Sequence, residues 1–394
     1  MKTNIFLLAL ALLAPAQGDP EVIKIISSLP RTGSARGQTD TIVNGIRMAL
    51  EEVGHKIGAF TIRYEDLDDA TAAAGQWTAE REAANADQAI KAPDVMVYIG
   101  TYNSGAAKVS MPKLNRATLL MISPANTATG LTKPGMGDPG EPETYRPSGK
   151  INYTRVVPAD DIQGSVSAEW AKSLGLLKVY VLDDREVYGK GIADLFQARA
   201  EEIGLKILGR EGIDGQAQEF KPLMTKVKAV GPDLIYFGGT TQTKAGQLVK
   251  DMVAVGLKAR FMCPDGCFEQ AFIDSAGADN LNDRALITFG GLPAERLSGK
   301  GKVFVENYLK KFGKMPEAYA AYGYECAKVA LEAIRRAGKK DRDAIRAAGV
   351  SLRDFDGVLG KWSFDKNGDT TIRTMSGNTV KNGKFAFLTV LGED

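Results

Sequence analysis

Two segments in the first half of the chain place small polar residues directly after a short apolar run. The run Val95–Gly100 leads into Thr101–Ser104, and the run Leu119–Ile122 leads into Ser123–Thr127. Apolar runs of this length are typical of buried strands, and ligands of open α/β sheets bind beyond the carboxyl ends of the strands. Hydroxyls and backbone N–H groups gathered there favour a carboxylate or another anion. The sequence therefore predicts a small-molecule site.

The order of strand-like and helix-like segments predicts the fold that positions this site. Before residue 123, predicted strands at 22–27, 61–65, 95–100 and 119–122 alternate with predicted helices at 41–53 and 71–90. A Pro-rich loop at 133–150 interrupts this order, and a second series follows. It has predicted helices at 163–173, 189–203, 220–230, 244–255, 300–312 and 318–337, and predicted strands at 178–182, 234–237, 260–262, 285–290, 361–364 and 385–390. Such alternation predicts two α/β lobes, each a mainly parallel sheet flanked by helices, with a cleft between them.

The composition narrows the classes of function. The 394 residues carry a net charge of +2 and a single histidine, His55. A near-neutral balance gives no basic groove, so we expect no nucleic-acid partner. One histidine makes a Ser–His hydrolase or a multi-histidine metal site improbable. We expect no cofactor, no metal and no enzymatic activity.

The N-terminus predicts export. Lys2 precedes the apolar run Ile5–Leu13, and Ala14–Ala16 gives an A-x-A cleavage pattern. The run is too short to span a bilayer as a helix. Residues 1–18 are therefore predicted to be a signal peptide, and the mature protein to be periplasmic.

Three cysteines follow, at positions 263, 267 and 326. Cys263 and Cys267 flank a Pro-Asp-Gly segment, which favours a chain reversal. Because export favours oxidation, we predict a disulfide between these two, with Cys326 left as a buried thiol.

Four short segments resemble the type I periplasmic solute-binding proteins of ABC importers, in the branch that binds leucine, isoleucine and valine. They are Met121–Thr127 with Leu131–Thr132, Asp184–Gly191, Phe237–Gly239 with Gly246–Gln247, and Phe261–Gly266. The resemblance implies a two-lobe fold joined by a hinge with several crossovers. It implies a first lobe of residues 19–157 plus about 288–360, and a second of 158–287 plus about 361–394.

The resemblance also implies roles for particular residues. Ser104, the backbone at Ala125, and Thr127 would hold a ligand carboxylate, with Asn126 in the same loop. A zwitterion taken from water needs such donors at one end and an acceptor charge at the other.

Asp265 would be that acceptor for the ligand ammonium, helped by Tyr188. Thr240 stands where the family often has an aromatic side chain, and Tyr102 and Asn103 would line the pocket for the ligand side chain. Donors on one lobe and an acid on the other would make lobe closure depend on the ligand.

The implied function is capture of an α-amino acid of the branched-chain type by a monomer that delivers it to an ABC permease in the inner membrane. Alternatives remain open: a sensing module for a receptor, or a binding protein for a small carboxylate, amide or aromatic acid without an α-amino group. Ser104 and Thr127 are also common helix-capping residues, and Asp265 in Pro-Asp-Gly is also a common turn residue.

Overall fold

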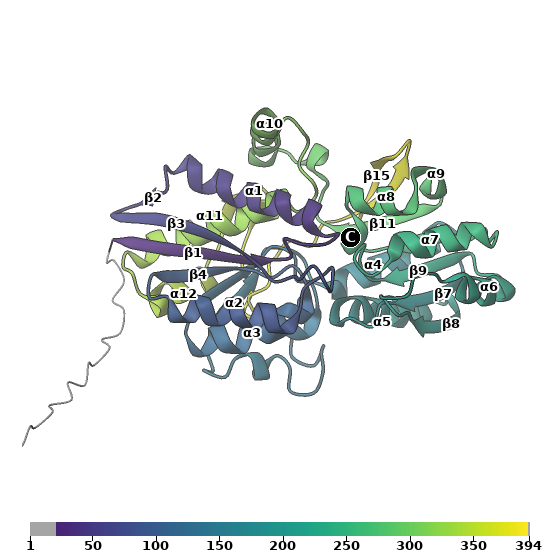
Figure 1. Cartoon of the computed structure of the whole chain (residues 1–394), viewed down its shortest axis with the longest axis horizontal. Helices are drawn as coiled ribbons and strands as arrows, with labels where there is room; N and C mark the ends of the chain where they lie inside the picture. The colour runs from purple at the N-terminus through teal and green to yellow at the C-terminus, as the bar shows by residue number, and fades with distance from the viewer. Residues whose placement is uncertain (1–20, 393–394) are drawn as a thin grey trace, which may run out of the picture.

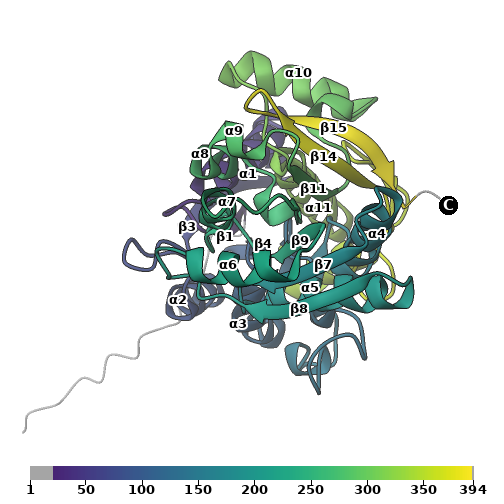
Figure 2. The same ribbon diagram turned by 90° about the vertical axis from the view of Figure 1, so that its right-hand side faces the viewer.

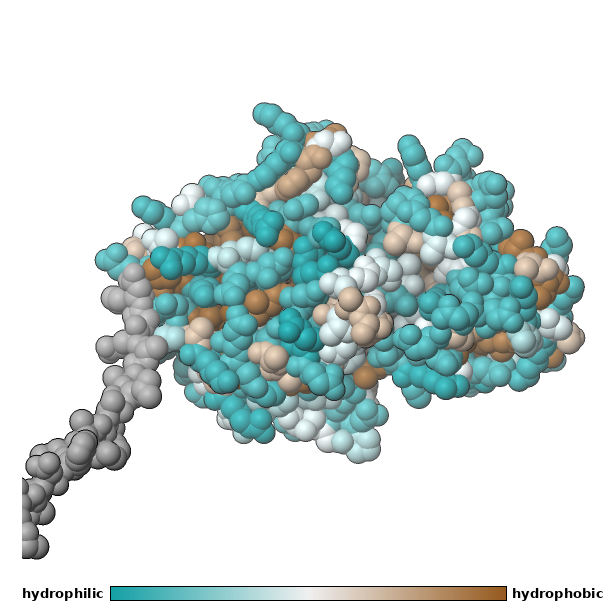
Figure 3. Space-filling model, in the orientation of Figure 1, coloured by the Kyte–Doolittle hydropathy of each residue, from teal (hydrophilic) through white to brown (hydrophobic). Residues whose placement is uncertain are grey.

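The computed structural model describes residues 21–392, so the predicted signal peptide lies outside the described residues. The chain forms two lobes side by side, each built on its own sheet (Figure 1). None of the helices in the described part is both long and apolar enough to span a membrane. Hydrophilic residues cover most of the face in Figure 3, with hydrophobic ones dispersed among them.

The first lobe holds a six-stranded sheet in the order β2-β3-β1-β4-β5-β6, parallel except for β2 against β3. Its strands are β1 Val22–Leu29, β2 Lys56–Ile57, β3 Phe60–Asp68, β4 Val95–Gly100, β5 Leu120–Ser123 and β6 Tyr153–Arg155. Its early helices are α1 Arg36–Glu52, α2 Ala79–Lys91 and α3 Ser104–Arg116, with short turns η1 Thr129–Leu131 and η2 Glu143–Tyr145.

The second lobe holds a seven-stranded sheet in the order β15-β14-β11-β10-β9-β7-β8, in which β14 and β15 are antiparallel to their neighbours. Its strands are β7 Lys178–Asp183, β8 Lys206–Gly212, β9 Leu234–Gly238, β10 Arg260–Cys263, β11 Ala285–Gly290, β14 Met375–Lys381 and β15 Lys384–Leu391. Its helices are α4 Asp160–Ser173, α5 Val187–Glu202, α6 Lys221–Val230, α7 Ala245–Ala254, α8 Gln270–Ala276 and α9 Ala278–Leu281, with the turn η3 Asp265–Cys267. Figure 2 shows β14 and β15 paired along one side of the molecule.

The chain crosses between the lobes after β6, after β11 and again before β14. The middle excursion carries η4 Ala294–Arg296, α10 Lys300–Phe312, α11 Ala320–Ala337, α12 Arg342–Val350 and the hairpin β12 Phe355–Gly357 with β13 Gly360–Trp362. Helix α11 packs on α1 because glycines permit close backbone approach: a Cβ at Gly45 would overlap the carbonyl of Ala320, and one at Gly323 that of Ile42. This packing returns the late helices to the first lobe.

The predicted α/β class with two mainly parallel sheets is confirmed, and most predicted elements lie within a few residues of their expected bounds. The helix expected at 71–90 begins only at Ala79, because the Thr78 side chain accepts from the N–H of Arg81 and the preceding chain turns at Gly75, which has φ +67°. The elements that were not predicted include strands β6, β8 and β14 and helices α8, α9 and α12. β8 is a half-buried edge strand, and β14 reads as a polar sequence although it is almost wholly buried.

A buried ion pair fixes the last crossover to the first sheet. Arg155 at the end of β6 has no exposed surface, and its Nε donates to Asp369 Oδ1 at 2.7 Å. Its Nη1 donates to the carbonyl of Ala128 at 2.8 Å, so the same guanidinium also holds the loop after β5. Burial raises the pKa of Asp369, but the charge of Arg155, the hydrogen bonds from Arg155 and Thr132 and the charge of Lys133 together outweigh burial and leave the pKa below its ordinary value.

Replacing Asp369 with alanine should lower the free energy of unfolding by about 3–5 kcal/mol, because it leaves the buried Arg155 cation unpaired. Denaturant unfolding at pH 7 measures this change. Since the pKa of Asp369 is depressed in the folded state, its contribution to stability is fully present above its unfolded-state pKa of about 4. That contribution is lost as the pH falls through the folded-state pKa. Asp356→Ala, which removes an exposed partner of Lys300, is the matched control and should cost at most about 1 kcal/mol. Equal losses for both variants would contradict the assignment.

Candidate ligand-binding site

The carboxyl ends of both sheets meet at a partly open cavity with an empty volume of about 270 Å³, which includes space open to solvent. It contains every residue predicted for the site except Asn126 and Thr127, and it adds Gly266 and Tyr319. The lining residues are Tyr102, Asn103, Ser104, Ala125, Tyr188, Thr240, Asp265, Gly266 and Tyr319. The predicted residues in this lining are thus drawn from five segments, those after β4, β5, β7, β9 and β10, in two lobes.

The first lobe supplies hydrogen-bond donors. Helix α3 begins at Ser104, so the N–H groups of its first turn have no acceptor within the helix. Ser104 Oγ accepts from the N–H of Ala128 at 3.3 Å, which leaves its hydroxyl proton for a ligand. Within residues 21–392, the buried Thr127 Oγ1 has no hydrogen-bond partner. This wall suits a carboxylate.

Asn126 has a different place from the predicted ligand contact. Its Nδ2 donates to the carbonyl of Tyr102 at 3.0 Å, and its Oδ1 accepts from Tyr153 OH at 3.2 Å. The N–H groups of Ala125 and Asn126 both donate to Ser123 Oγ, at 3.2 and 2.8 Å. Asn126 therefore braces the two strand-end loops against each other, and Ala125 lines the cavity.

The second lobe supplies the acid. Asp265 is 3% exposed, and Tyr188 OH donates to its Oδ1 at 2.7 Å. Tyr319 OH, from the segment before α11, donates to the other oxygen. Burial raises the pKa of Asp265 above its ordinary value, and the two phenols act against that rise. Neutral donors hold this carboxylate without neutralising it.

Tyr319 was not among the predicted site residues. It precedes a long helix rather than following a strand, so strand-end reasoning could not find it. Its ring meets those of Tyr102 and Phe289 edge-on, with centroids 6.1 and 5.5 Å apart. These rings give the cavity an apolar wall beside its polar ends.

Asp160 at the start of α4 is a second unpredicted acid near the site. It has no exposed surface, and in the described part of the chain neither carboxylate oxygen has a hydrogen-bond partner. Burial, followed by the charge of Asp265, raises its pKa well above the ordinary value. The N–H of Asp160 donates to the carbonyl of Thr127 at 2.9 Å, which ties it to the donor wall.

The three cysteines are buried free thiols, so the predicted Cys263–Cys267 disulfide is not formed in the structure. The segment between them winds into η3, which carries Asp265 to the cavity and directs Cys267 Sγ to the carbonyl of Gly239 at 3.7 Å. Burial raises the pKa of Cys267, and the neighbouring Cys263 thiol adds to this. In residues 21–392 no group of three or more His, Cys, Asp and Glu side chains is placed to hold a metal ion.

Comparison with known proteins defines the class. The sequence matches the periplasmic binding protein family over residues 22–384, and the chain belongs to that family. An amino acid binding protein of Pseudomonas aeruginosa is 28% identical over 345 residues, covering 87% of this chain and 86% of that protein. The Leu/Ile/Val-binding protein homolog 1 of Brucella suis is 28% identical over 349 residues, covering 86% and 85%.

Solved structures agree. A leucine binding protein of Thermotoga maritima superposes with a TM-score of 0.81 at 27% identity, covering 94% of this chain and 98% of that one. A solute binding protein of R. palustris in complex with benzoate shares the fold, with a TM-score of 0.77 at 16% identity over 95% and 98% of the two chains. The resemblance carried by the four sequence segments, and the two-lobe type I fold it implies, are confirmed.

The thiol state can be checked by titration. Because all three thiols are buried and burial raises the pKa of Cys267 and Cys326, native protein should react slowly with a thiol reagent at pH 8. Three thiols per chain should react once denaturant is added without reductant. A count of one thiol in denaturant would show that the predicted disulfide forms after all.

Proposed function

We propose that this protein is the extracytoplasmic solute-binding component of an ABC importer, and that it captures an α-amino acid between its lobes and delivers it to a membrane permease. One observation carries the proposal. The buried Asp265 carboxylate has only neutral donors, and the cavity it lines ends at Ser104 and the start of α3. An acid at one end and donors at the other complement the ammonium and carboxylate of a zwitterion.

The middle of the cavity supports the same ligand class. The rings of Tyr102, Tyr188 and Tyr319 with the methyl group of Ala125 offer apolar contact to the carbon atoms of an amino-acid side chain. The names of the relatives, an amino acid binding protein and Leu/Ile/Val-binding homologues, support an amino acid over a plain carboxylic acid. Export by the predicted signal peptide would bring the protein to the periplasm, where a permease accepts its ligand.

The contacts between the lobes support capture by closure. Asn103 Nδ2 of the first lobe donates to Gln242 Oε1 of the second at 3.2 Å, and Gln38 Nε2 donates to the carbonyl of Phe268 at 3.3 Å. Both are single neutral hydrogen bonds, each worth about 1 kcal/mol. These two contacts are weak enough to open and close, and Tyr319 OH of the first lobe also donates to Asp265 of the second, so a ligand that meets Asp265 would bear directly on the balance between open and closed forms.

The ammonium assignment is tested by comparing Asp265→Ala with Ser104→Ala. After a thermal-shift screen of the natural amino acids identifies the best ligand, calorimetry should show that Asp265→Ala costs about 3–5 kcal/mol of binding free energy, since the desolvated ammonium loses its countercharge. Ser104→Ala removes one of several donors and should cost about 1–3 kcal/mol. These losses correspond to a hundred-fold or more for the first change and about ten- to a hundred-fold for the second.

Asp265→Asn keeps the shape of the side chain and both tyrosine contacts, so it serves as the control for folding. It should also bind weakly, because an amide brings no charge to the ammonium. If Asp265→Ala or Asp265→Asn binds the ligand like the parent, the ammonium does not pair with this residue and the ligand is an acid without an α-amino group.

A further inference from the structure

A second cavity adjoins the ligand cavity on the side of the α5 start. Its empty volume is about 240 Å³. Four residues line both spaces, namely Asn103, Ser104, Tyr188 and Thr240, and the second space adds Gly105, Asp184, Glu186 and Thr243. Thr240 is the position where the family resemblance expects an aromatic ring. Its small side chain adds no second ring to that of Tyr188, which lines both spaces, so a ligand that reaches the second space passes Tyr188.

A third, solvent-open cavity lies beyond, between the loop after β5 and α5. Its empty volume is about 970 Å³, and it shares Glu186 with the second cavity. Asp160, whose buried oxygens have no partner among the described residues, forms part of its wall. The three spaces form a series that runs from Asp265 to the cleft mouth.

Four acids lie along this series of cavities. In residues 21–392, no ion pair joins Asp160, Asp184, Glu186 or Asp265 to a lysine, arginine or histidine. Asp184 accepts only neutral donors, Thr243 Oγ1 at 2.8 Å and the N–H of Glu186 at 3.0 Å. Burial raises the pKa of Asp160 and the charge of Arg155 lowers it, whereas Asp184, Glu186 and Asp265 have no ion-pair partner among residues 21–392.

Basic residues line only the outer cavity of the series. Neither of the two inner cavities has a lysine, arginine or histidine in its lining. In the outer cavity, Lys108 pairs with Glu141 at 2.6 Å and Lys190 with Asp194 at 2.6 Å, while Arg185 donates to the carbonyl of Gly212 at 2.7 Å. In the two inner cavities, therefore, positive charge would have to come from the ligand.

An α-amino acid with a neutral side chain does not supply this positive charge, because its ammonium and carboxylate charges cancel and its carboxylate is met by neutral donors. We infer, resting on the proposed function, that the ligand is an α-amino acid with a cationic side chain, whose ammonium or guanidinium lies in the second cavity against Asp184 and Glu186. The apolar stem of such a side chain passes the tyrosine rings, as lysine and arginine stems do at protein surfaces. Charged partners also form the stronger hydrogen bonds, since each carboxylate then accepts from a cation.

The pKa values of these acids are raised, as expected of buried carboxylates without a cationic partner. Burial raises the pKa of Asp184 to about 7 and raises that of Glu186 above its ordinary value. Around Asp184 stand Thr243, which lowers its pKa, and the acids Glu186 and Asp183, which raise it. A ligand cation would favour the ionised forms and release protons on binding.

Matched pairs of ligands test the inference on the mature protein. Lysine and norleucine differ in the terminal ammonium, and arginine and citrulline share a shape but differ in charge. Calorimetry at pH 8 should show that lysine binds about ten-fold or more tightly than norleucine, and arginine likewise over citrulline. Leucine should bind no better than norleucine.

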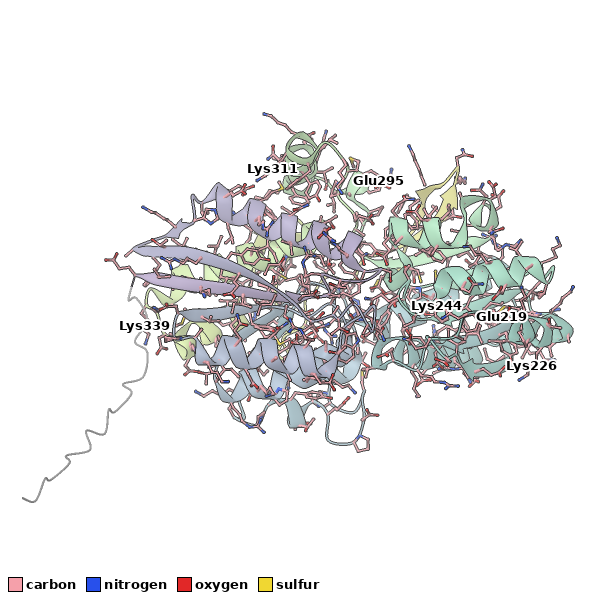
Figure 4. The ribbon with its side chains drawn as sticks, viewed as in Figure 1. Glu219, Lys226, Lys244, Glu295, Lys311 and Lys339 are labelled. Carbon is pink, nitrogen blue, oxygen red and sulfur yellow. The ribbon has the colours of Figure 1, made fainter. Side chains whose placement is uncertain are left out.

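Glu186→Gln is the informative variant, because Glu186 carries charge into the second cavity and its side chain forms no ion pair within the described chain. It should narrow the ratio of lysine to norleucine affinity to about three-fold or less while leaving norleucine affinity nearly unchanged. Glu219→Gln is the matched control. Glu219 is exposed on the outside of the second lobe (Figure 4), and its replacement should leave the ratio as in the parent.

The possible outcomes separate the two proposals. If norleucine or leucine binds as tightly as lysine, the inference of a cationic ligand side chain is wrong, while the proposed capture of an amino acid stands. If citrulline equals arginine, neutral N–H donors suffice and the inference again fails. If no amino acid binds, both the inference and the proposed function are overturned.

Discussion

The site depends on one buried carboxylate. Asp265 is buried between the lobes. It accepts hydrogen bonds from Tyr188 of its own lobe and from Tyr319 of the first lobe. Both are neutral, so burial keeps the pKa of Asp265 raised and the negative charge uncompensated. A desolvated acid of this kind is costly until a cation arrives. On the proposed function, ligand binding would be coupled to closure of the lobes, because the acid and the carboxylate donors come from different lobes.

The rest of the fold holds the two walls of the cleft in place. On the donor wall, Arg155 binds Asp369 and the loop after β5, while Asn126 ties that loop to the chain after β4. The glycine-mediated contact between α1 and α11 presents Tyr319 to the cleft from the first lobe. The lobes are also joined directly, by the bond from Tyr319 to Asp265 at the site and by the ion pair of Lys133 with Asp161 at 2.7 Å.

Much of the fold and of the donor wall could be predicted from the sequence for one physical reason. Parallel strands deliver the residues that follow them to a common edge, so short apolar runs followed by Thr101–Ser104 or Ser123–Thr127 marked the donor wall. Asp160 and Tyr319 were missed because their helices reach the cleft only through the crossovers. Asn126 was placed at the ligand for its position in a loop, whereas its hydrogen bonds face the neighbouring loop. The Pro-Asp-Gly turn was expected to join two cysteines, but it forms η3 and presents Asp265 instead.

Small-angle X-ray scattering tests the central claim, that a ligand bridging Asp265 and the donor wall closes the lobes. The parent protein should show a smaller radius of gyration with saturating amino acid than without it, whereas Asp265→Asn at the same ligand concentration should show no such compaction. An unchanged radius of gyration in the parent, at a ligand concentration that calorimetry shows to be saturating, would contradict the account.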